Sequence, residues 1–166
     1  MMAAFFGKYR GRVTGNTDPK HLGRIQVSCP AVLGAGRTSW AMPCVPYAGP
    51  GVGLYAIPPV DAYVWVEFEG GDPDVPIWAG CFWGDGELPV SPAAPTTKVF
   101  RTPGITVTVD DLQGGKGVTV RAEPPLVTAP AVLALTSAGI ELSVGASKIV
   151  LSGTSVAVND GALEVL

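Results

Sequence analysis

The C-terminal part of the chain alternates apolar residues with small or polar ones, and glycine interrupts the pattern every few positions. The stretch GIELSVGASKIVLSGTSVAVNDGALEVL, residues 139–166, shows this most clearly. A period of two is typical of β-strands with one apolar face, whereas an amphipathic helix needs a period of 3.6. The sequence therefore predicts a series of short strands joined by glycine-containing turns.

These strands have nothing within the same chain to cover their apolar face. Each is about 5 residues, or roughly 17 Å, long. Burying a valine, leucine or isoleucine side chain stabilises by about 1.5–3 kcal/mol, so a dozen left in water would forfeit on the order of 20–30 kcal/mol, more than the net stability of a domain. We therefore expect copies of the ribbon to associate, most simply as a three-fold prism with aliphatic faces inward and Thr and Ser faces outward. The residues expected in this inward stripe are Ile105, Val107, Val109, Val118, Val120, Ile140, Leu142, Val144, Ile149, Leu151, Val156 and Val158.

Two alternatives to self-association stay open. The ribbon could fold back on the rest of the chain, although a proline-rich segment before it holds it away. It could also be an ordinary second β-sandwich, although about 60 residues broken by glycine is small for that fold.

The whole chain of 166 residues reads as all-β, with three zones. Residues 1–84 contain alternating strands such as AYVWVEFEGGD and no helical period, which suits a small closed barrel. Residues 85–104 are rich in proline, alanine and threonine and read as an extended connector. Residues 105–166 form the ribbon. The high counts of 22 Gly and 16 Pro fit a chain that turns often.

Composition argues against several classes of function. Only 15 % of residues are charged and the net charge is −3, so the chain lacks the basic face that nucleic-acid binding needs. No apolar run is long enough to cross a bilayer. In the N-terminal segment MMAAFFGKYRGR the basic residues follow the apolar patch, the reverse of a signal peptide, so we expect assembly in the cytoplasm. The widely spaced Cys29, Cys44 and Cys81 fit buried free thiols in a reducing compartment rather than a disulfide framework or a zinc site.

The titratable residues give no strong sign of catalysis, of a cofactor or of a metal. His21 lies in a loop, NTDPKHLG, that supplies no partner for catalysis or metal binding. Glu67 and Glu69 share one strand face and could form the carboxylate pair of a glycosidase, but the solvated outer face of a barrel explains them more simply. An enzyme is therefore the weakest hypothesis.

We expect an aromatic cluster late in the barrel zone, made of Trp65, Trp78, Phe82 and Trp83. On a barrel they could stack bases or sugars, which leaves open a monomeric module that binds an oligosaccharide or single-stranded nucleic acid. No basic residues interleave with them in the sequence, and acidic residues surround them. We therefore favour core packing and a protein interface.

The barrel zone also resembles a known family. The segments GRVTGNTDPKHLGRIQVSCP, PYAGPGVGLYAIPPV and VWVEFEGGDPDVPIWAGCFWG are similar to the oligonucleotide/oligosaccharide-binding (OB) barrel of contractile-tail spike proteins. These include phage baseplate assembly protein V and the valine-glycine repeat (VgrG) spikes of type VI secretion. The resemblance covers residues 8–84 and is most specific at Asp18-Pro19 and at Gly70-Gly71-Asp72-Pro73. The glycine-punctuated tail also resembles the short β-helical needle of the family.

This resemblance implies a non-enzymatic homotrimeric spike in a virion tail or injection-system baseplate. It implies a baseplate hub protein as partner, with Trp65, Trp78, Phe82 and Trp83 as candidates for that interface. It further implies a needle that transiently contacts and punctures the target membrane, with a proline-alanine-alanine-arginine (PAAR) repeat protein as the candidate cap. The expected tip residues are Leu163, Val165 and Leu166.

Three departures from the family pattern bear on function. The sequence shows no lysozyme-like insertion between barrel and ribbon, and we expect the hub to be a separate protein rather than a fused domain. The paired histidines that hold iron at some tips are missing, because His21 is the sole histidine. Asp61 also occupies a position where the resemblance implies glycine.

Overall fold

The computed structural model describes residues 4–114 and 116–165, with no account of the side chains of residues 164 and 165. It divides into two compact units, Met1–Glu87 and Leu88–Leu166. Nearly all its regular structure is β, as the sequence predicts. Among the described residues, no helix has the length and apolar character needed to span a membrane.

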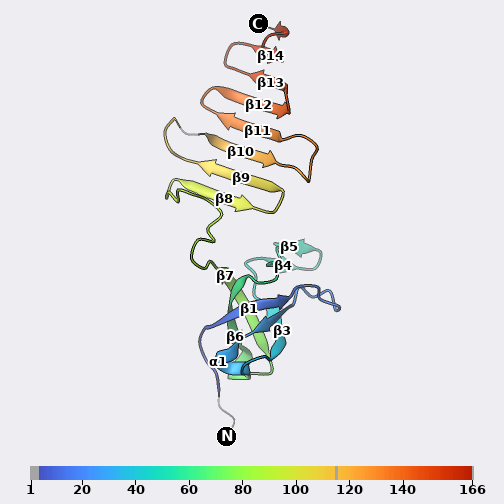
Figure 1. Ribbon diagram of the computed structural model, residues 1–166, viewed down its shortest axis with the longest axis vertical. Helices are drawn as coiled ribbons and strands as arrows, with labels where there is room; N and C mark the ends of the chain where they lie inside the picture. The colour runs from blue at the N-terminus through green and yellow to red at the C-terminus, as the bar shows by residue number, and fades with distance from the viewer. Residues whose placement is uncertain (1–3, 115, 166) are drawn as a thin grey trace. The chain divides into compact units, whose positions relative to one another are not determined.

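The first unit is a closed five-stranded barrel with strand order β1-β2-β3-β7-β6 (Figure 1). Its strands are β1 (Tyr9–Gly15), β2 (Ile25–Ser28), β3 (Thr38–Pro43), β6 (Tyr63–Phe68) and β7 (Pro76–Phe82). Every pairing is antiparallel except that of β3 with β7, which is parallel and closes the barrel. Closure leaves no free strand edge on the barrel.

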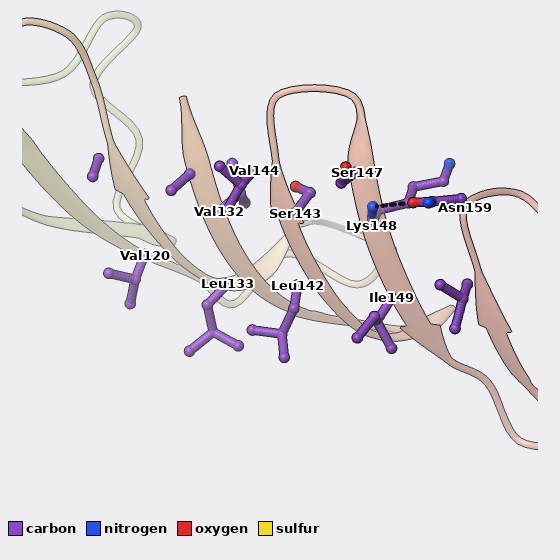
Figure 2. Close-up of a pocket in the computed structure, with 13 residues that line it drawn as sticks. Val120, Val132, Leu133, Leu142, Ser143, Val144, Ser147, Lys148, Ile149 and Asn159 are labelled. Atoms are coloured by element: carbon purple, nitrogen blue, oxygen red, sulfur yellow. Dashed lines mark hydrogen bonds between the residues drawn. The ribbon is translucent and has the colours of Figure 1, made fainter. Parts of the chain in front are cut away.

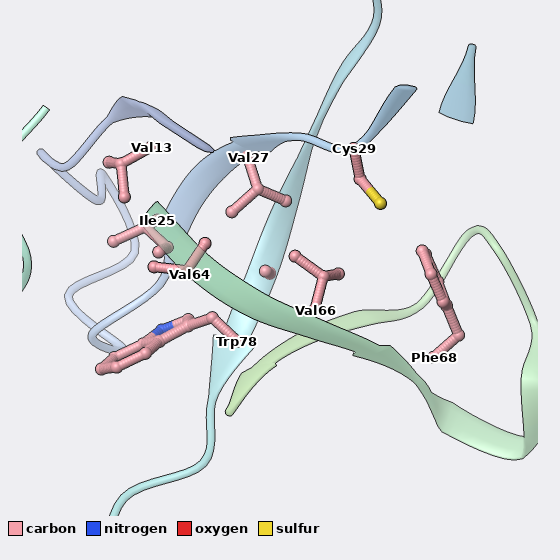
Figure 3. Packing of buried hydrophobic residues seen from close by; sticks show 9 residues of the cluster. Val13, Ile25, Val27, Cys29, Val64, Val66, Phe68 and Trp78 are labelled. Atoms are coloured by element: carbon pink, nitrogen blue, oxygen red, sulfur yellow. The ribbon is translucent and has the colours of Figure 1, made fainter. Parts of the chain in front are cut away.

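Period-two alternation places the core of the barrel. Val64, Val66 and Phe68 of β6 point inward and are buried, while Trp65 and Glu67 between them are not. Figure 3 shows these inward side chains converging from several strands. The full core comprises Val13, Ile25, Val27, Cys29, Ala41, Val64, Val66, Phe68 and Trp78. The alternation that the sequence shows in AYVWVEFEGGD is therefore confirmed for residues 64–68.

Short elements connect the barrel strands. The helix α1 (Pro30–Leu33) follows β2, and a two-stranded hairpin pairs β4 (Ala48–Gly49) with β5 (Val52–Gly53). The 3-10 turn η1 (Glu69–Gly71) joins β6 to β7. The sequence reading missed α1 and the hairpin, because both are too short for periodicity to reveal. The turn before β6 places Asp61 at φ 73°, a left-handed conformation that suits glycine and that aspartate tolerates better than most residues.

The carboxylate of Asp18 organises the loop between β1 and β2. It accepts backbone N–H groups of Lys20, Leu22 and Arg24, and it forms an ion pair with the Arg24 guanidinium at 2.6 Å. The hydrogen bond from Arg24 and those from the backbone hold the pKa of Asp18 well below its usual range. The Arg24 guanidinium in turn lies over the Trp40 ring, 5.0 Å from its centroid. The motif that carries the family resemblance thus serves to fix this loop.

The second unit is one eight-stranded antiparallel sheet in which each strand pairs with the next along the chain (Figure 1). The strands are β8 (Thr97–Arg101), β9 (Ile105–Asp110), β10 (Gly117–Ala122), β11 (Ala131–Thr136), β12 (Gly139–Val144), β13 (Ser147–Leu151), β14 (Val156–Val158) and β15 (Leu163–Val165). None of its residues with a described side chain belongs to the buried core, which lies wholly in the barrel.

Two strands of this sheet were not expected from the sequence. Residues 97–101, assigned to the connector, form β8, because they lie in a proline-free stretch between Pro95 and Pro103 and pair with β9. The second unit accordingly begins at Leu88 rather than at residue 105. Residues 131–136 form β11, which the sequence pattern does not predict because prolines at 124, 125 and 130 precede it.

Candidate trimerisation surface

The register of the sheet gathers its apolar side chains into rows on one face. Because side chains alternate along each strand and residues opposite each other share a face, one row can be followed across every strand. The central row pairs Phe100 with Val107 and continues through Val120, Leu133, Leu142, Ile149 and Val158 to Leu163. A second row runs through Val109, Val118, Leu135, Ile140, Leu151 and Val156. A shorter third row contains Ile105, Ala122, Ala131 and Val144. We call these three rows the apolar face.

All twelve residues predicted for the inward stripe lie on the apolar face. The structure therefore brings together residues as far apart in sequence as Ile105 and Val158. Their burial between copies of the chain remains a prediction.

In a single chain the apolar face is open. The exposed fraction is 48 % for Leu142, 59 % for Val144 and 60 % for Phe100. Such side chains have gained roughly half of the 1.5–3 kcal/mol that complete burial provides. For about a dozen of them the missing part is on the order of 10–15 kcal/mol, as large as the net stability of a domain. Something must cover this face in the working protein.

The apolar face is also concave. A hollow of about 590 Å³ lies against it, lined mainly by aliphatic side chains. Figure 2 shows Val120, Leu133, Leu142 and Ile149 pointing to the same side from four successive strands. A surface of this kind fits another set of aliphatic side chains better than a small polar ligand.

The opposite face carries most of the charge of the sheet. Arg121, Glu141 and Lys148 lie there, together with threonines and serines such as Thr108 and Ser143. The Lys148 ammonium forms an ion pair with Asp160 at 2.5 Å, which raises the pKa of Lys148 above its ordinary value. Within the described side chains, none of the residues named in the three rows is charged, and the second row extends onto β8 at Lys98, which pairs with Asp111. This asymmetry identifies the apolar face as the one to be covered.

Sequence reasoning missed three large members of the apolar face: Phe100, Leu133 and Leu135. Phe100 lies in residues 85–104, which the sequence predicts to be an extended connector rather than a strand. Leu133 and Leu135 stand in AVLALT, where consecutive apolar residues obscure which side is inward. Their spacing of two, directly after Pro130, is the signal that would have found them.

The aromatic residues of the barrel do not form one cluster. Trp78 is 4 % exposed and its indole Nε1 donates to the Gly23 carbonyl at 3.3 Å, so the expectation that it contributes to a hub interface is wrong. The alternation of β7 is the reason, since it turns Pro76 and Trp78 inward. Trp65 and Phe82 lie together on the outer surface with ring centroids 4.6 Å apart. Trp83 is 63 % exposed just beyond β7.

Basic residues do accompany the outer aromatic rings, contrary to the reading of the sequence. The pairing of β1 with β6 sets Arg10 opposite Trp65 and Arg12 opposite Tyr63. The Arg10 guanidinium lies 5.3 Å from the Trp65 ring centroid and 4.9 Å from that of Phe82. These partners are more than 50 residues apart in sequence, so no local pattern shows the contact.

The remaining candidates for chemistry are accounted for by structural contacts. Glu67 forms an ion pair with Lys8 at 2.5 Å, while Glu69 belongs to the turn η1. Across the described residues, no group of three His, Cys, Asp or Glu side chains is placed to hold a metal ion. Of the cysteines, Cys29 is buried, but Cys44 and Cys81 are exposed, so the expectation of buried thiols is wrong for these two.

The tip candidates lie at the end of the sheet. Leu163 and Val165 belong to β15, and Leu163 is 62 % exposed. Leu166 lies outside the described residues.

Comparison with protein-family models gives two matches, which follow the two units. Residues 9–83 match the type VI secretion system/phage-baseplate injector OB domain. Residues 97–164 match the phage baseplate V C-terminal trimerisation domain. A search of curated proteins gave no match. The trimerisation match covers the whole apolar face from Phe100 to Leu163.

Proposed function

Since this chain belongs to the phage baseplate V family of injector proteins, with an OB barrel and a C-terminal trimerisation domain, we propose that it is the homotrimeric, membrane-puncturing spike of a contractile tail or injection system. Membership of the family gives the chain a structural role in a baseplate. The puncturing role, the attachment to a hub and the absence of enzymatic activity are the proposal.

The observation that carries the proposal is the uncovered apolar face of the sheet. Three identical sheets turned about one axis cover three such faces at once, and the charged faces then point to solvent. The match to a trimerisation domain over the same residues supports three as the number of copies. In the trimer we expect the sheets to wrap into a β-helical prism with the rows of the apolar face inside.

A prism of this kind suits a mechanical task. No strand of it can leave without exposing the apolar rows of two neighbours, so unfolding has a high barrier and the assembly persists under load. A narrow, rigid, kinetically stable body is what driving a needle through an envelope requires. We place the tip at β15, where a PAAR-type protein is the candidate cap.

The barrel is the proposed attachment to a baseplate hub protein. The candidates for that contact are Trp65, Phe82 and Trp83. Trp78 is not one of them, because it is buried in the barrel core. Arg10, stacked on Trp65 and Phe82, joins them. Arginine and aromatic residues are enriched where protein interfaces concentrate their binding energy.

The Arg10 stack also favours one alternative, a monomeric OB module that binds an oligosaccharide or single-stranded nucleic acid. Guanidinium groups beside exposed rings are a common element of such sites. Titration with oligonucleotides and glycans separates the two functions. Saturable micromolar binding by a monomer would support the alternative.

The proposed trimer is tested by placing a charge on each face of one strand. Leu142→Asp would bring three carboxylates together among aliphatic side chains. None of the neighbouring residues on this face carries a positive charge that could neutralise them. We expect this variant to lose the trimer entirely, as measured by light scattering on a sizing column. The matched control is Ser143→Asp, one residue along β12 on the charged face and opposite Lys148, which should remain trimeric. A trimeric, heat-resistant Leu142→Asp would show that the apolar face is not the interface.

A further inference from the structure

The barrel carries a second apolar surface that its core does not use. Residues 38–60 contain no charged side chain, although they include the β4–β5 hairpin and much of the outer surface around it. We use the name hairpin surface for five large side chains that are more than half exposed here: Leu22, Tyr47, Val52, Leu54 and Tyr55. The most exposed is Tyr55, at 81 %.

The hairpin surface is a built feature rather than a loose loop. Ala48 pairs with Gly53 and Gly49 with Val52, and the Leu54 N–H donates to the Tyr47 carbonyl at 2.9 Å. The Asp18 network fixes Leu22 from the other side through the hydrogen bond from the Leu22 N–H. Between these two elements lies an open hollow of about 590 Å³. An ordered apolar protrusion beside an apolar hollow is a surface prepared for contact.

The copies of the chain itself are the partners best placed to reach this surface. Fourteen residues, 83–96, separate the last barrel strand from the first strand of the trimerisation domain, and fully extended they span at most about 50 Å. Three barrels tied so closely to one trimeric shaft meet each other at an effective concentration in the millimolar range. A weak apolar contact is enough to join them at that concentration.

Charge points to the same partner. Each chain carries a net charge of −3, and identical copies repel where like-charged surfaces approach an axis. A stretch without any charge can meet its own copies near an axis without that cost. We infer that the three barrels contact one another through the hairpin surface, an inference that rests on the proposed homotrimer.

The test uses cross-linking within the full-length trimer. In a Cys44→Ser, Cys81→Ser background, which keeps only the buried Cys29, Tyr55→Cys adds one reactive thiol at the hairpin. A short bismaleimide should then join pairs of chains into covalent dimers on a denaturing gel. The yield should not change on dilution, because the reacting copies belong to one trimer.

The matched control is Ala35→Cys in the same background. Ala35 is exposed directly after α1, which lies at the opposite end of the barrel from the hairpin (Figure 1). We expect about tenfold less covalent dimer from this position, because the thiols there lie away from the proposed contact and beyond the reach of a short cross-linker. The masses of both variants are measured before cross-linking.

A charge variant gives a second readout. Adding Val52→Asp to Tyr55→Cys should reduce covalent dimer severalfold while the mass stays trimeric, whereas adding Ala31→Asp in α1 should leave the yield unchanged. Equal cross-linking at the hairpin and at Ala35→Cys, or a Val52→Asp variant that cross-links fully, would overturn the inference although the trimer stands. In that case the hairpin surface would not contact other copies of the chain, and it would be available to a different protein. A monomeric mass would instead overturn the proposed function.

Discussion

At the scale of single residues, the functional surfaces depend on a few side chains whose partners lie close in sequence. Asp18 is the clearest example, because one carboxylate satisfies three backbone N–H groups and a guanidinium within seven residues. The same loop supports Leu22 and, through the Gly23 carbonyl, the indole of Trp78. The loop motif is therefore a structural device that joins the barrel core to the surface beside the hairpin.

We predict that Asp18→Asn lowers the melting temperature of the barrel by several degrees at neutral pH. The asparagine side chain loses the ion pair with Arg24 and part of the acceptor capacity that the backbone donors need. All four tryptophans lie between residues 40 and 83, so tryptophan fluorescence reports the barrel alone.

The difference between the wild type and Asp18→Asn should depend on pH in one direction. Folding lowers the pKa of Asp18, so its contribution is complete above the unfolded value of about 3.9 and is lost as pH falls from there through the folded value. The two melting temperatures should therefore converge in strong acid and differ by a constant amount between pH 5 and 8. A difference that grows on acidification would refute this role.

At the scale of elements, the sheet repeats a device in which a strand begins with glycine opposite a carbonyl. Gly117 opens β10 at φ 61° and Gly139 opens β12 at φ 129°. A Cβ on Gly117 would overlap the carbonyl oxygen of Leu135, and one on Gly139 that of Leu151. These glycines let the neighbouring strand of the sheet approach closely, and they keep the turns between strands tight.

We predict that Gly139→Ala weakens the trimer, because the added methyl group pushes β12 away from β13 and displaces Ile140 from its row. The temperature at which the trimer dissociates should fall by 10 °C or so, the shift expected for roughly 2 kcal/mol in a small unit. Gly153→Ala is the control, since a Cβ there has open space and the backbone is not left-handed. Equal dissociation temperatures for the two variants would show that the glycine device is irrelevant to assembly.

Much of this arrangement could be predicted from the sequence, and the failures have a common cause. Period-two alternation located the inward side chains of β6 and the stripe through Leu142, because alternation is a local property of a strand. The Arg10–Trp65 contact, the burial of Trp78 and the strand β8 depend on which strands pair, and that is decided by the whole fold. The hairpin surface was likewise invisible to periodicity, since β4 and β5 have two residues each.

At the scale of the whole molecule, the two units gain stability in different ways. The barrel buries nine hydrophobic residues within its own chain. The sheet has no such core among its described residues and exposes its apolar rows, so its stability as a folded unit depends on other copies of the chain. We therefore predict that folding of the second unit and assembly are one event.

The most direct test is the mass of the unmodified protein in solution at micromolar concentration, by sedimentation equilibrium or light scattering, with circular dichroism on the same sample. We predict a β-rich species of three times the 17.0 kDa of one chain, with no folded monomer in equilibrium with it. A fully folded species of 17.0 kDa with an intact sheet would contradict the account.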